Sequence, residues 1–242
     1  MCGRFAQPRS ADELARIFHA RAASQLEGGR FNVAPTDPIL AVVERHAERV
    51  LDEFRWGLIP VYATSRRGAA RLINARSEAV ETSGAFRVAF QRQRCIIPAD
   101  AFYEWRRPSD ADGRRAARPQ PFAIRLATSL PMAFAGLWST WHDPVSAERV
   151  HTASILTGPP NALVASVHDR MPVILDASDW SAWLDESASP ETLRALLRPA
   201  PAEAMTMYAV SPAVNDVRSD GAGLLEPISR WQPSLWADSP PA

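Results

Sequence analysis

Short apolar runs separated by proline, glycine and charged residues dominate the chain and predict a protein built mainly from β-strands. Alternating or β-branched runs of this length are typical of strands in a sheet. The runs that we expect to form strands are 39–43, 50–56, 94–98, 102–105, 122–126, 132–138, 151–157, 171–175 and 205–210. The first two should pair with each other. Residues 31–36 should be extended as well, because the residue before Pro35 disfavours helix.

Few segments show the three-to-four-residue apolar spacing of a helix. Residues 10–13 (Ser-Ala-Asp-Glu) have the sequence of a capping box and predict a helix start. The helix should run to the glycines at 28–29 and present one apolar face, formed by Leu14, Ile17 and Phe18. Shorter helices are expected at 86–90, 161–166, 179–184 and 191–197. The last of these follows Pro190, a residue favoured in the first helical turn.

The order and length of these elements predict an α+β fold. Many short strands, few helices and abundant proline favour a single domain built on a mostly antiparallel, barrel-like β-sheet with short peripheral helices. We find no internal repeat and no linker long enough to divide residues 1–242. The proline-rich tail, from about 230 to 242, is expected to be frayed.

Composition narrows the class of protein. Hydrophobic residues make up 46% of the chain and charged residues 22%, which is ordinary for a soluble globular protein. The longest apolar runs are too short to cross a membrane, and no secretory signal is visible. The two cysteines and five histidines lack the spacing of a disulfide framework or a metal site. We therefore expect a cytoplasmic protein without a metal or other cofactor.

The net charge of zero hides an asymmetry between the two halves of the chain. Residues 1–125 contain 21 arginines against 14 acidic residues, and residues 126–242 contain 6 against 13. A basic half is compatible with an anionic partner such as nucleic acid. A well-solvated surface of mixed charges would explain the same count.

The second residue offers an unusual chemistry. If Met1 is removed, as small residues at position 2 generally permit, Cys2 carries a free α-amine beside its own thiol. The pKa of an α-amine is near 8, so a substantial fraction is unprotonated at neutral pH. The amine can add to an aldehyde to form an imine, and the thiol can then close a five-membered thiazolidine. Cys2 could equally be an ordinary N-terminal residue.

Every one of the 27 basic residues counted as lysine or arginine is arginine. Because arginine does not lose its proton in proteins, no side chain here can serve as a Schiff-base amine. Any covalent amine chemistry would therefore depend on the α-amine of Cys2. Genomic base composition could also explain the missing lysines.

Three polar residues stand in apolar surroundings. Glu104 lies within Ala-Phe-Tyr-Glu-Trp, where desolvation would raise the pKa of its carboxyl as a general acid requires; it could also face water on an edge strand. His168 precedes an apolar run and could move protons, or be structural. Asn74 interrupts the apolar run at 71–76, as asparagine at a turn commonly does.

Together, these residues belong to a set of motifs that resembles one known family. The motifs are Met-Cys-Gly-Arg-Phe at 1–5, Phe-Asn-Val-Ala-Pro-Thr at 31–36, Arg-Trp-Gly-Leu-Ile-Pro at 55–60, Ile-Asn-Ala-Arg-Ser-Glu at 73–78, Arg-Cys-Ile-Ile-Pro at 94–98, Phe-Tyr-Glu-Trp at 102–105 and His-Asp-Arg-Met-Pro-Val-Ile-Leu at 168–175. They resemble, in the same order, the SOS response-associated peptidase family. The resemblance spans residues 2 to about 215.

The resemblance implies a DNA damage response protein that senses abasic sites in single-stranded DNA. Such a protein loses Met1, autocatalytically in one view, and forms a thiazolidine DNA–protein crosslink that shields the lesion. The implied catalytic residues are Cys2 as nucleophile, Asn74 to orient it, Glu104 as general acid and base, and His168 to assist proton transfer. The implied DNA-binding residues are Arg4, Arg76, Arg87 and Arg170 at phosphates and Trp56 and Trp105 at bases. We expect a monomer that associates with the nucleoid when bound to DNA.

A second class of function remains open. In a cysteine-dependent N-terminal-nucleophile peptidase or amidohydrolase, the Cys2 thiol would attack a carbonyl and its own amine would act as base. The trapped product separates the two, since an aldehyde gives a stable thiazolidine and an amide gives a hydrolysable acyl-enzyme. A nucleic-acid-binding module without chemistry would leave Glu104 and His168 unexplained.

Overall fold

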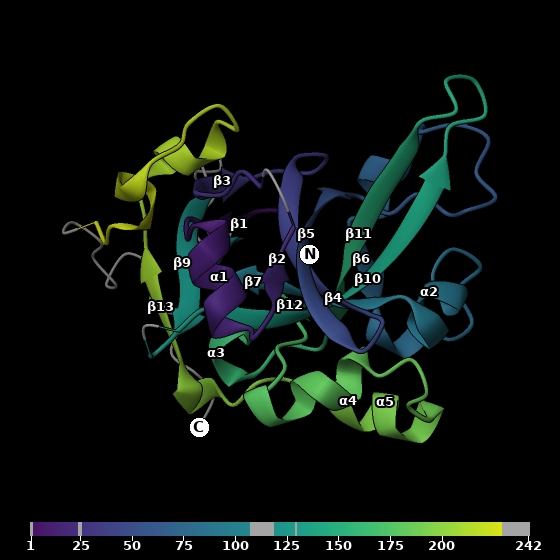
Figure 1. The fold of residues 1–242 in the computed structure, drawn as a ribbon. Helices are drawn as coiled ribbons and strands as arrows, with labels where there is room; N and C mark the ends of the chain where they lie inside the picture. The colour runs from purple at the N-terminus through teal and green to yellow at the C-terminus, as the bar shows by residue number, and fades with distance from the viewer. Residues whose placement is uncertain (1, 24–25, 107–118, 129, 229–242) are drawn as a thin grey trace.

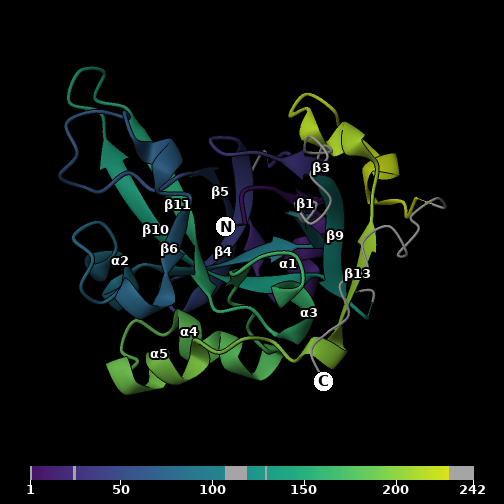
Figure 2. The same cartoon turned by 180° about the vertical axis from the view of Figure 1, so that it is seen from behind.

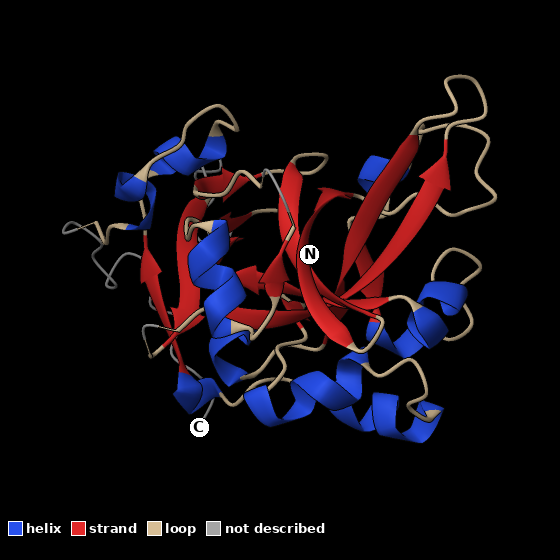
Figure 3. Cartoon of the chain, viewed as in Figure 1, coloured by secondary structure: helices blue, strands red, loops and turns tan. Residues whose placement is uncertain are grey.

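The computed structural model describes residues 2–23, 26–106, 119–128 and 130–228. Within these residues, thirteen strands lie at the centre and short helices surround them (Figure 3). The strands are β1 (Phe5–Gln7), β2 (Arg21–Ala22), β3 (Arg30–Val33), β4 (Pro38–Arg45), β5 (Glu48–Trp56), β6 (Asn74–Arg76), β7 (Arg94–Ala99), β8 (Ala101–Arg106), β9 (Gln120–Leu126), β10 (Met132–His142), β11 (Arg149–Gly158), β12 (Met171–Pro172) and β13 (Met205–Ala209). The predicted α+β architecture is confirmed.

Five of the strands close into a barrel. Going round it, β11 pairs with β10, β10 with β7, β7 with β4 and β4 with β5, all antiparallel. A short parallel pairing of β5 with β11 completes the circle, with Arg55 opposite Thr152. The β10–β11 hairpin extends past the other barrel strands and lies beside the loop that follows β5 (Figure 1), where Arg66 pairs with Asp143 and Glu148. Closure protects the edges of these strands, and the barrel-like sheet predicted from the sequence is thus present.

A second sheet, in the order β13-β9-β8-β1-β3, packs against the barrel. The two share one buried core, in which Phe5 of β1 contacts Trp56 at 5.0 Å between ring centroids and Phe134 at 6.1 Å. Phe102 of β8 adds a further edge-on contact with Phe134. Edge-to-face aromatic pairs of this kind stabilise beyond their buried area. The packing fixes β1, and with it the start of the chain, over the barrel.

Short helices and 3-10 turns pack around the barrel and the second sheet. They are α1 (Ala11–Ile17), α2 (Arg87–Arg92), α3 (Ala162–Ala165), α4 (Trp180–Leu184) and α5 (Pro190–Leu196), with 3-10 turns η1 (Ala69–Arg71), η2 (Ser77–Ala79), η4 (Ala177–Asp179), η5 (Ala202–Ala204), η6 (Pro212–Asn215) and η7 (Ala222–Leu225). In Figure 2, α4 and α5 form a layer along one side of the sheets. Their apolar residues join a second core with those of α1 and α2.

The first helix starts as predicted and ends earlier. Ser10 caps it by accepting a hydrogen bond from the backbone N–H of Glu13. It stops at Ile17 because His19 adopts a left-handed conformation, with φ of 52°, and turns the chain toward β2. β2 then pairs with β5. The predicted end near residues 28–29 was wrong because Arg21 and Ala22 pair as a strand with β5, which the helical spacing does not reveal.

The other elements lie close to their predicted positions, with two differences. The run 171–175 forms a strand only over Met171–Pro172, although Ile174 makes an isolated bridge to Phe134. The extended segment 31–36 ends in a turn, in which Thr36 has a φ of 78°. The predicted tail at 230–242 lies outside the described residues.

A single buried arginine ties the helical layer to the barrel. Arg94 is only 3% exposed, and its guanidinium donates to the carbonyl oxygens of Phe90 and Gln91 at the end of α2. It also donates to those of Trp183 and Asp185 at the end of α4. The C-terminal end of a helix carries partial negative charge, so two such ends solvate this cation in place of water.

Candidate active site

The Cys2 side chain is fully buried where the second sheet meets the barrel. Its carbonyl oxygen accepts a hydrogen bond of 2.7 Å from Nδ2 of Asn74. Burial, and next the negative charge of Glu104, raise the pKa of the Cys2 thiol well above its ordinary value. The thiol is therefore protonated at neutral pH, and its reaction as a nucleophile requires a nearby group that takes its proton.

Asn74 reaches Cys2 from the first position of β6. This strand pairs in parallel with β11, which places Asn74 opposite Ile155. Its Nδ2 is occupied by Cys2, and its Oδ1 is buried without a hydrogen-bond partner in the part of the chain that the structure describes. Buried polar atoms normally have partners. The amide thus fixes the backbone of Cys2 and leaves one acceptor available in the site.

Glu104 lies on β8, which is an interior strand of its sheet, between β1 and β9. It is 3% exposed, so the alternative of a glutamate facing water is wrong. Desolvation raises the pKa of its carboxyl to about 7, and the positive charge of the amino terminus acts in the opposite direction. A carboxyl with this pKa can both give and take a proton near neutral pH.

His168 follows α3 and is partly exposed. Burial lowers its pKa, and the positive charge of the amino terminus lowers it further. That charge acts on Glu104 as well, so both side chains lie within electrostatic reach of the same end of the chain. The structure therefore brings Cys2, Asn74, Glu104 and His168 into one neighbourhood, although they come from four distant parts of the sequence.

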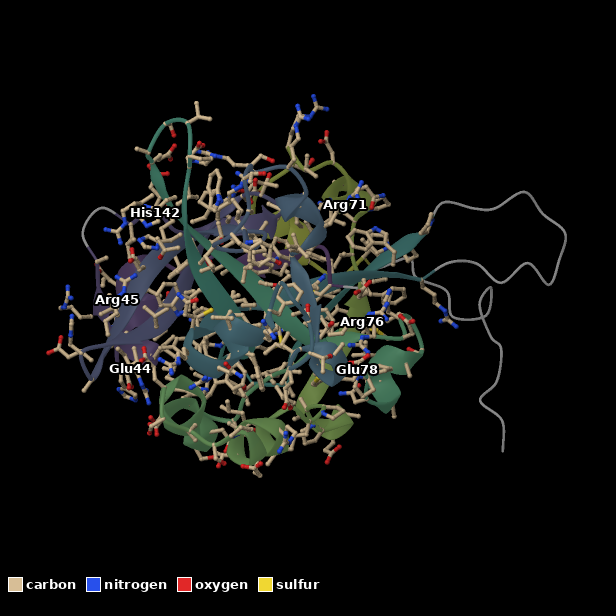
Figure 4. The ribbon with its side chains drawn as sticks, turned by 90° about the vertical axis from the view of Figure 1, so that its right-hand side faces the viewer. Glu44, Arg45, Arg71, Arg76, Glu78 and His142 are labelled. Atoms are coloured by element: carbon tan, nitrogen blue, oxygen red, sulfur yellow. The ribbon has the colours of Figure 1, made fainter. Side chains whose placement is uncertain are left out.

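The predicted phosphate ligands fall into two groups. Arg76 and Arg87 are exposed on the surface, and Figure 4 shows Arg76 on the same side as Arg71. Arg4 is half-buried and donates to Oδ1 of Asn32 at 2.8 Å and to the carbonyl of Val214 at 2.7 Å.

Arg170 is also engaged within the protein, in an ion pair with Glu78. These contacts within the protein restrict the guanidinium groups of Arg4 and Arg170, and the expectation that they bind phosphates stays a prediction. Exposed Arg76 and Arg87 are free of that restriction.

The predicted aromatic contacts need a correction. Trp56 is 0% exposed, packs on Phe5 and donates its indole N–H to the carbonyl of Ile73. It cannot stack on a base in this conformation, because the inward face of β5 places it in the core. Trp105 is half-buried, lies 5.9 Å from the guanidinium of Arg4 and donates to Asn215.

Sequence reasoning missed an exposed aromatic residue in the loop that follows β5. Tyr62 is 67% exposed. The loop leaves the barrel at Gly57, whose φ is 123° and where a Cβ would lie 2.7 Å from the carbonyl oxygen of Ala69. It returns at Asn74. The signal was weak, because Tyr62 lies between Val61 and Ala63 and only the preceding Gly57 and Pro60 favour a loop at this position.

Neither a metal site nor a membrane span is found in the described residues. No group of three or more His, Cys, Asp or Glu side chains there is placed to hold a metal ion. No helix in the same residues is long and apolar enough to cross a membrane.

Comparison with known proteins assigns the chain to a family. The SOS response associated peptidase (SRAP) family matches residues 1–217. The chain is 36% identical over 231 residues to abasic site processing protein YoqW of Bacillus subtilis, covering 93% of this chain and 99% of that protein. It is 30% identical over 239 residues to abasic site processing protein YedK of Escherichia coli, covering 94% and 100%.

A solved structure shares the architecture. The crystal structure of a protein from Bacteroides thetaiotaomicron superposes with a TM-score of 0.82 at 22% identity, covering 94% of this chain and all of that one. This similarity concerns the fold alone. The family match and the two relatives settle the classification that the motifs suggested: the chain belongs to the SRAP family.

Proposed function

We propose that this protein processes abasic sites in single-stranded DNA by forming a covalent thiazolidine crosslink through Cys2. The observation that carries the proposal is the placement of Cys2, whose backbone is held by Asn74 and whose thiol lies within the electrostatic field of Glu104. The names of the relatives record abasic-site processing. An abasic sugar in its open form presents an aldehyde, which is the partner that an aminothiol selects.

The reaction balances with groups that the chain supplies. After removal of Met1, the α-amine of Cys2 adds to the aldehyde carbon, and loss of one water gives an imine. The sulfur then bonds to the imine carbon, while the thiol proton is transferred, by way of Glu104, to the nitrogen. Because the pKa of Glu104 is raised to about 7, the same carboxyl can protonate the departing hydroxyl and then accept the thiol proton.

DNA binding is proposed to use exposed groups outside the buried site. Arg76 and Arg87 would contact phosphates, and Tyr62 would offer a face on which a base could stack. Trp105 and Arg4, which contact each other, would form a partly buried rim. No base needs to be read, since the lesion is recognised by its aldehyde.

The peptidase alternative receives less support. A cysteine that attacks an amide works as a thiolate, and sites of that kind lower the thiol pKa. Here burial and Glu104 raise it. An imine-forming amine needs no thiolate in its first step, so the environment of Cys2 suits an aldehyde better than an amide.

Intact mass spectrometry tests the proposal directly. The mature protein should begin at Cys2, and incubation with single-stranded DNA containing an abasic site should add the mass of the DNA less one water. Cys2→Ser should retain imine formation, so its adduct should be trapped by borohydride and decay without it. A protein that keeps Met1, or a Cys2→Ser adduct as durable as the parental one, would contradict the mechanism.

A further inference from the structure

An ion pair joins the loop that carries His168 to the turn that follows Asn74. Nη1 and Nη2 of Arg170 lie 2.5 and 2.8 Å from the two carboxylate oxygens of Glu78. Hydrogen bonds from Arg170 lower the pKa of Glu78 to about 2, so the carboxylate is ionised at neutral pH. Nη2 also donates to the carbonyl of Thr157 on β11 at 2.6 Å. The bidentate geometry fixes the guanidinium in both position and plane.

The backbone of Arg170 in turn contacts the ring of His168. Its N–H donates to Nδ1 of His168 at 3.0 Å. A ring nitrogen that accepts a hydrogen bond carries no proton, so the neutral imidazole bears its proton on Nε2. This contact selects one tautomer of the histidine.

A second group competes for the same nitrogen. Oδ1 of Asp169 also lies 3.0 Å from Nδ1, and only a protonated Nδ1 could donate to it. The Asp169 side chain is 88% exposed and is solvated without that contact, whereas Arg170 is only 14% exposed and held by Glu78. Loss of the anchor on Arg170 would therefore shift the ring toward the Nδ1-protonated form paired with Asp169.

We propose that Glu78 is a positioning residue for the crosslinking reaction, holding Arg170 so that its backbone N–H keeps His168 in the Nε2–H tautomer. The proposal rests on the proposed function, in which His168 assists proton transfer. Figure 4 shows Glu78 beside Arg76, at the end of the strand that begins with Asn74. One short segment thus orients Cys2 through Asn74 and His168 through Glu78.

The same ion pair admits a competing interpretation. Arg170 could be a phosphate ligand whose guanidinium is paired with Glu78 until a DNA phosphate displaces the Glu78 carboxylate. Under that interpretation, removing the carboxylate would tighten binding to DNA and leave the tautomer of His168 unchanged. The observations favour positioning, because Arg170 is mostly buried and also bonded to Thr157.

Glu78→Gln in the full chain tests the proposal, with Glu81→Gln as the matched control. Glu81 is a nearby glutamate that also pairs with an arginine, and in the described residues that arginine is Arg194 rather than Arg170. The ¹⁵N shifts of the His168 ring should report the Nε2–H tautomer in the parent and in the control, and a loss of that form in Glu78→Gln. The crosslinking rate of Glu78→Gln should fall by up to about 10²-fold, the cost of a misplaced catalytic group, while the control keeps the parental rate.

Arg170→Gln breaks the same pair from the other side and should change the tautomer in the same direction, which guards against an effect peculiar to one variant. An unchanged tautomer in both variants would overturn the proposal, as would tighter DNA binding by Glu78→Gln with no tautomer change. If the parent itself forms no crosslink, the proposed function fails, and the ring shifts still decide whether Glu78 positions His168.

Discussion

Two buried polar centres in this protein differ in how well their polar groups are hydrogen-bonded. Around Arg94, four carbonyl oxygens accept from one guanidinium at the ends of two helices. Around Cys2, a carboxyl is desolvated until its pKa reaches about 7, a thiol is held protonated, and Oδ1 of Asn74 has no partner in the described residues. The first arrangement stabilises the fold. The second keeps polar groups poorly solvated, which is costly for stability and useful for chemistry.

The sharpest way to test this contrast is Glu104→Gln. Crosslinking should slow by about 10²–10⁴-fold, because the amide cannot transfer a proton. The parental rate should also pass through a maximum between about pH 7 and about pH 8, because the reaction needs both the acid form of Glu104, whose pKa is about 7, and the unprotonated α-amine, whose ordinary pKa is near 8. The measurement is the crosslinking rate of both proteins with abasic single-stranded DNA across this pH range. If Glu104→Gln reacts at the parental rate, Glu104 does not transfer a proton in the reaction.

Glu104→Gln should be at least as stable as the parent, and the pH dependence of the free energy of unfolding should distinguish the two proteins. A carboxyl whose pKa is raised on folding binds its proton more tightly in the folded state. Stability should therefore decrease as pH rises from about 4.5 to about 7, by an amount on the order of 2–3 kcal/mol. Glu104→Gln should abolish this dependence. Denaturant unfolding at several pH values measures it, and an identical slope in both proteins would contradict the assigned pKa.

Arg94→Met should produce the opposite pattern. Four carbonyl oxygens would lose their donor, so the free energy of unfolding should fall by about 3–5 kcal/mol. Crosslinking by the protein that remains folded should be unchanged. The control is Arg92→Met, which removes an exposed arginine from the end of α2 and should alter stability by less than about 0.5 kcal/mol. Equal losses in the two variants would show that the carbonyl contacts of Arg94 contribute little.

The two aromatic residues near β5 extend the comparison. Trp56→Phe should cost about 1–3 kcal/mol of stability, because the core loses volume and the hydrogen bond to Ile73. Tyr62→Ala should leave stability nearly unchanged and weaken DNA binding by about 1–3 kcal/mol, if a base stacks on it. Thermal unfolding and fluorescence anisotropy separate the effects. If Trp56→Phe weakened DNA binding and Tyr62→Ala did not, the proposed stacking on Tyr62 would be wrong.

The smallest expected effect concerns salt. Affinity for single-stranded DNA should fall with salt concentration, and Arg76→Gln should reduce the log–log slope by roughly 0.7. Arg16→Gln, an exposed arginine on α1, is the control and should leave the slope unchanged. Equal slopes for Arg76→Gln and the parent would mean that Arg76 contacts no phosphate.

Sequence reasoning was most successful where the information is local. The capping box at Ser10 and the strand pair β4–β5 depend on neighbouring residues, and both were confirmed. It was least successful where two distant segments compete for one residue. The end of α1 depends on the pairing of β2 with β5, and the burial of Trp56 depends on how β1 packs on the barrel.

The candidate site shows the same division. The motifs named Cys2, Asn74, Glu104 and His168 individually, because each residue type carries its chemistry wherever it lies. Their sequence could not say that Nδ2 of Asn74 would bond to Cys2 across 72 positions, or that Glu104 would lie on an interior strand. It also gave no sign that Arg170 would pair with Glu78.

The sequence by itself determined the available chemistry, because Cys2 would carry an aminothiol if Met1 is removed and no lysine offers a second amine. It also determined the strand-rich pattern of a small barrel. Only the tertiary structure decided which of these groups are buried from solvent and which charged side chains form ion pairs. The physical reason is that a pKa and a hydrogen bond depend on distance and burial in space. Those quantities are set when β1, β6, β8 and the loop after α3 converge on one end of the barrel.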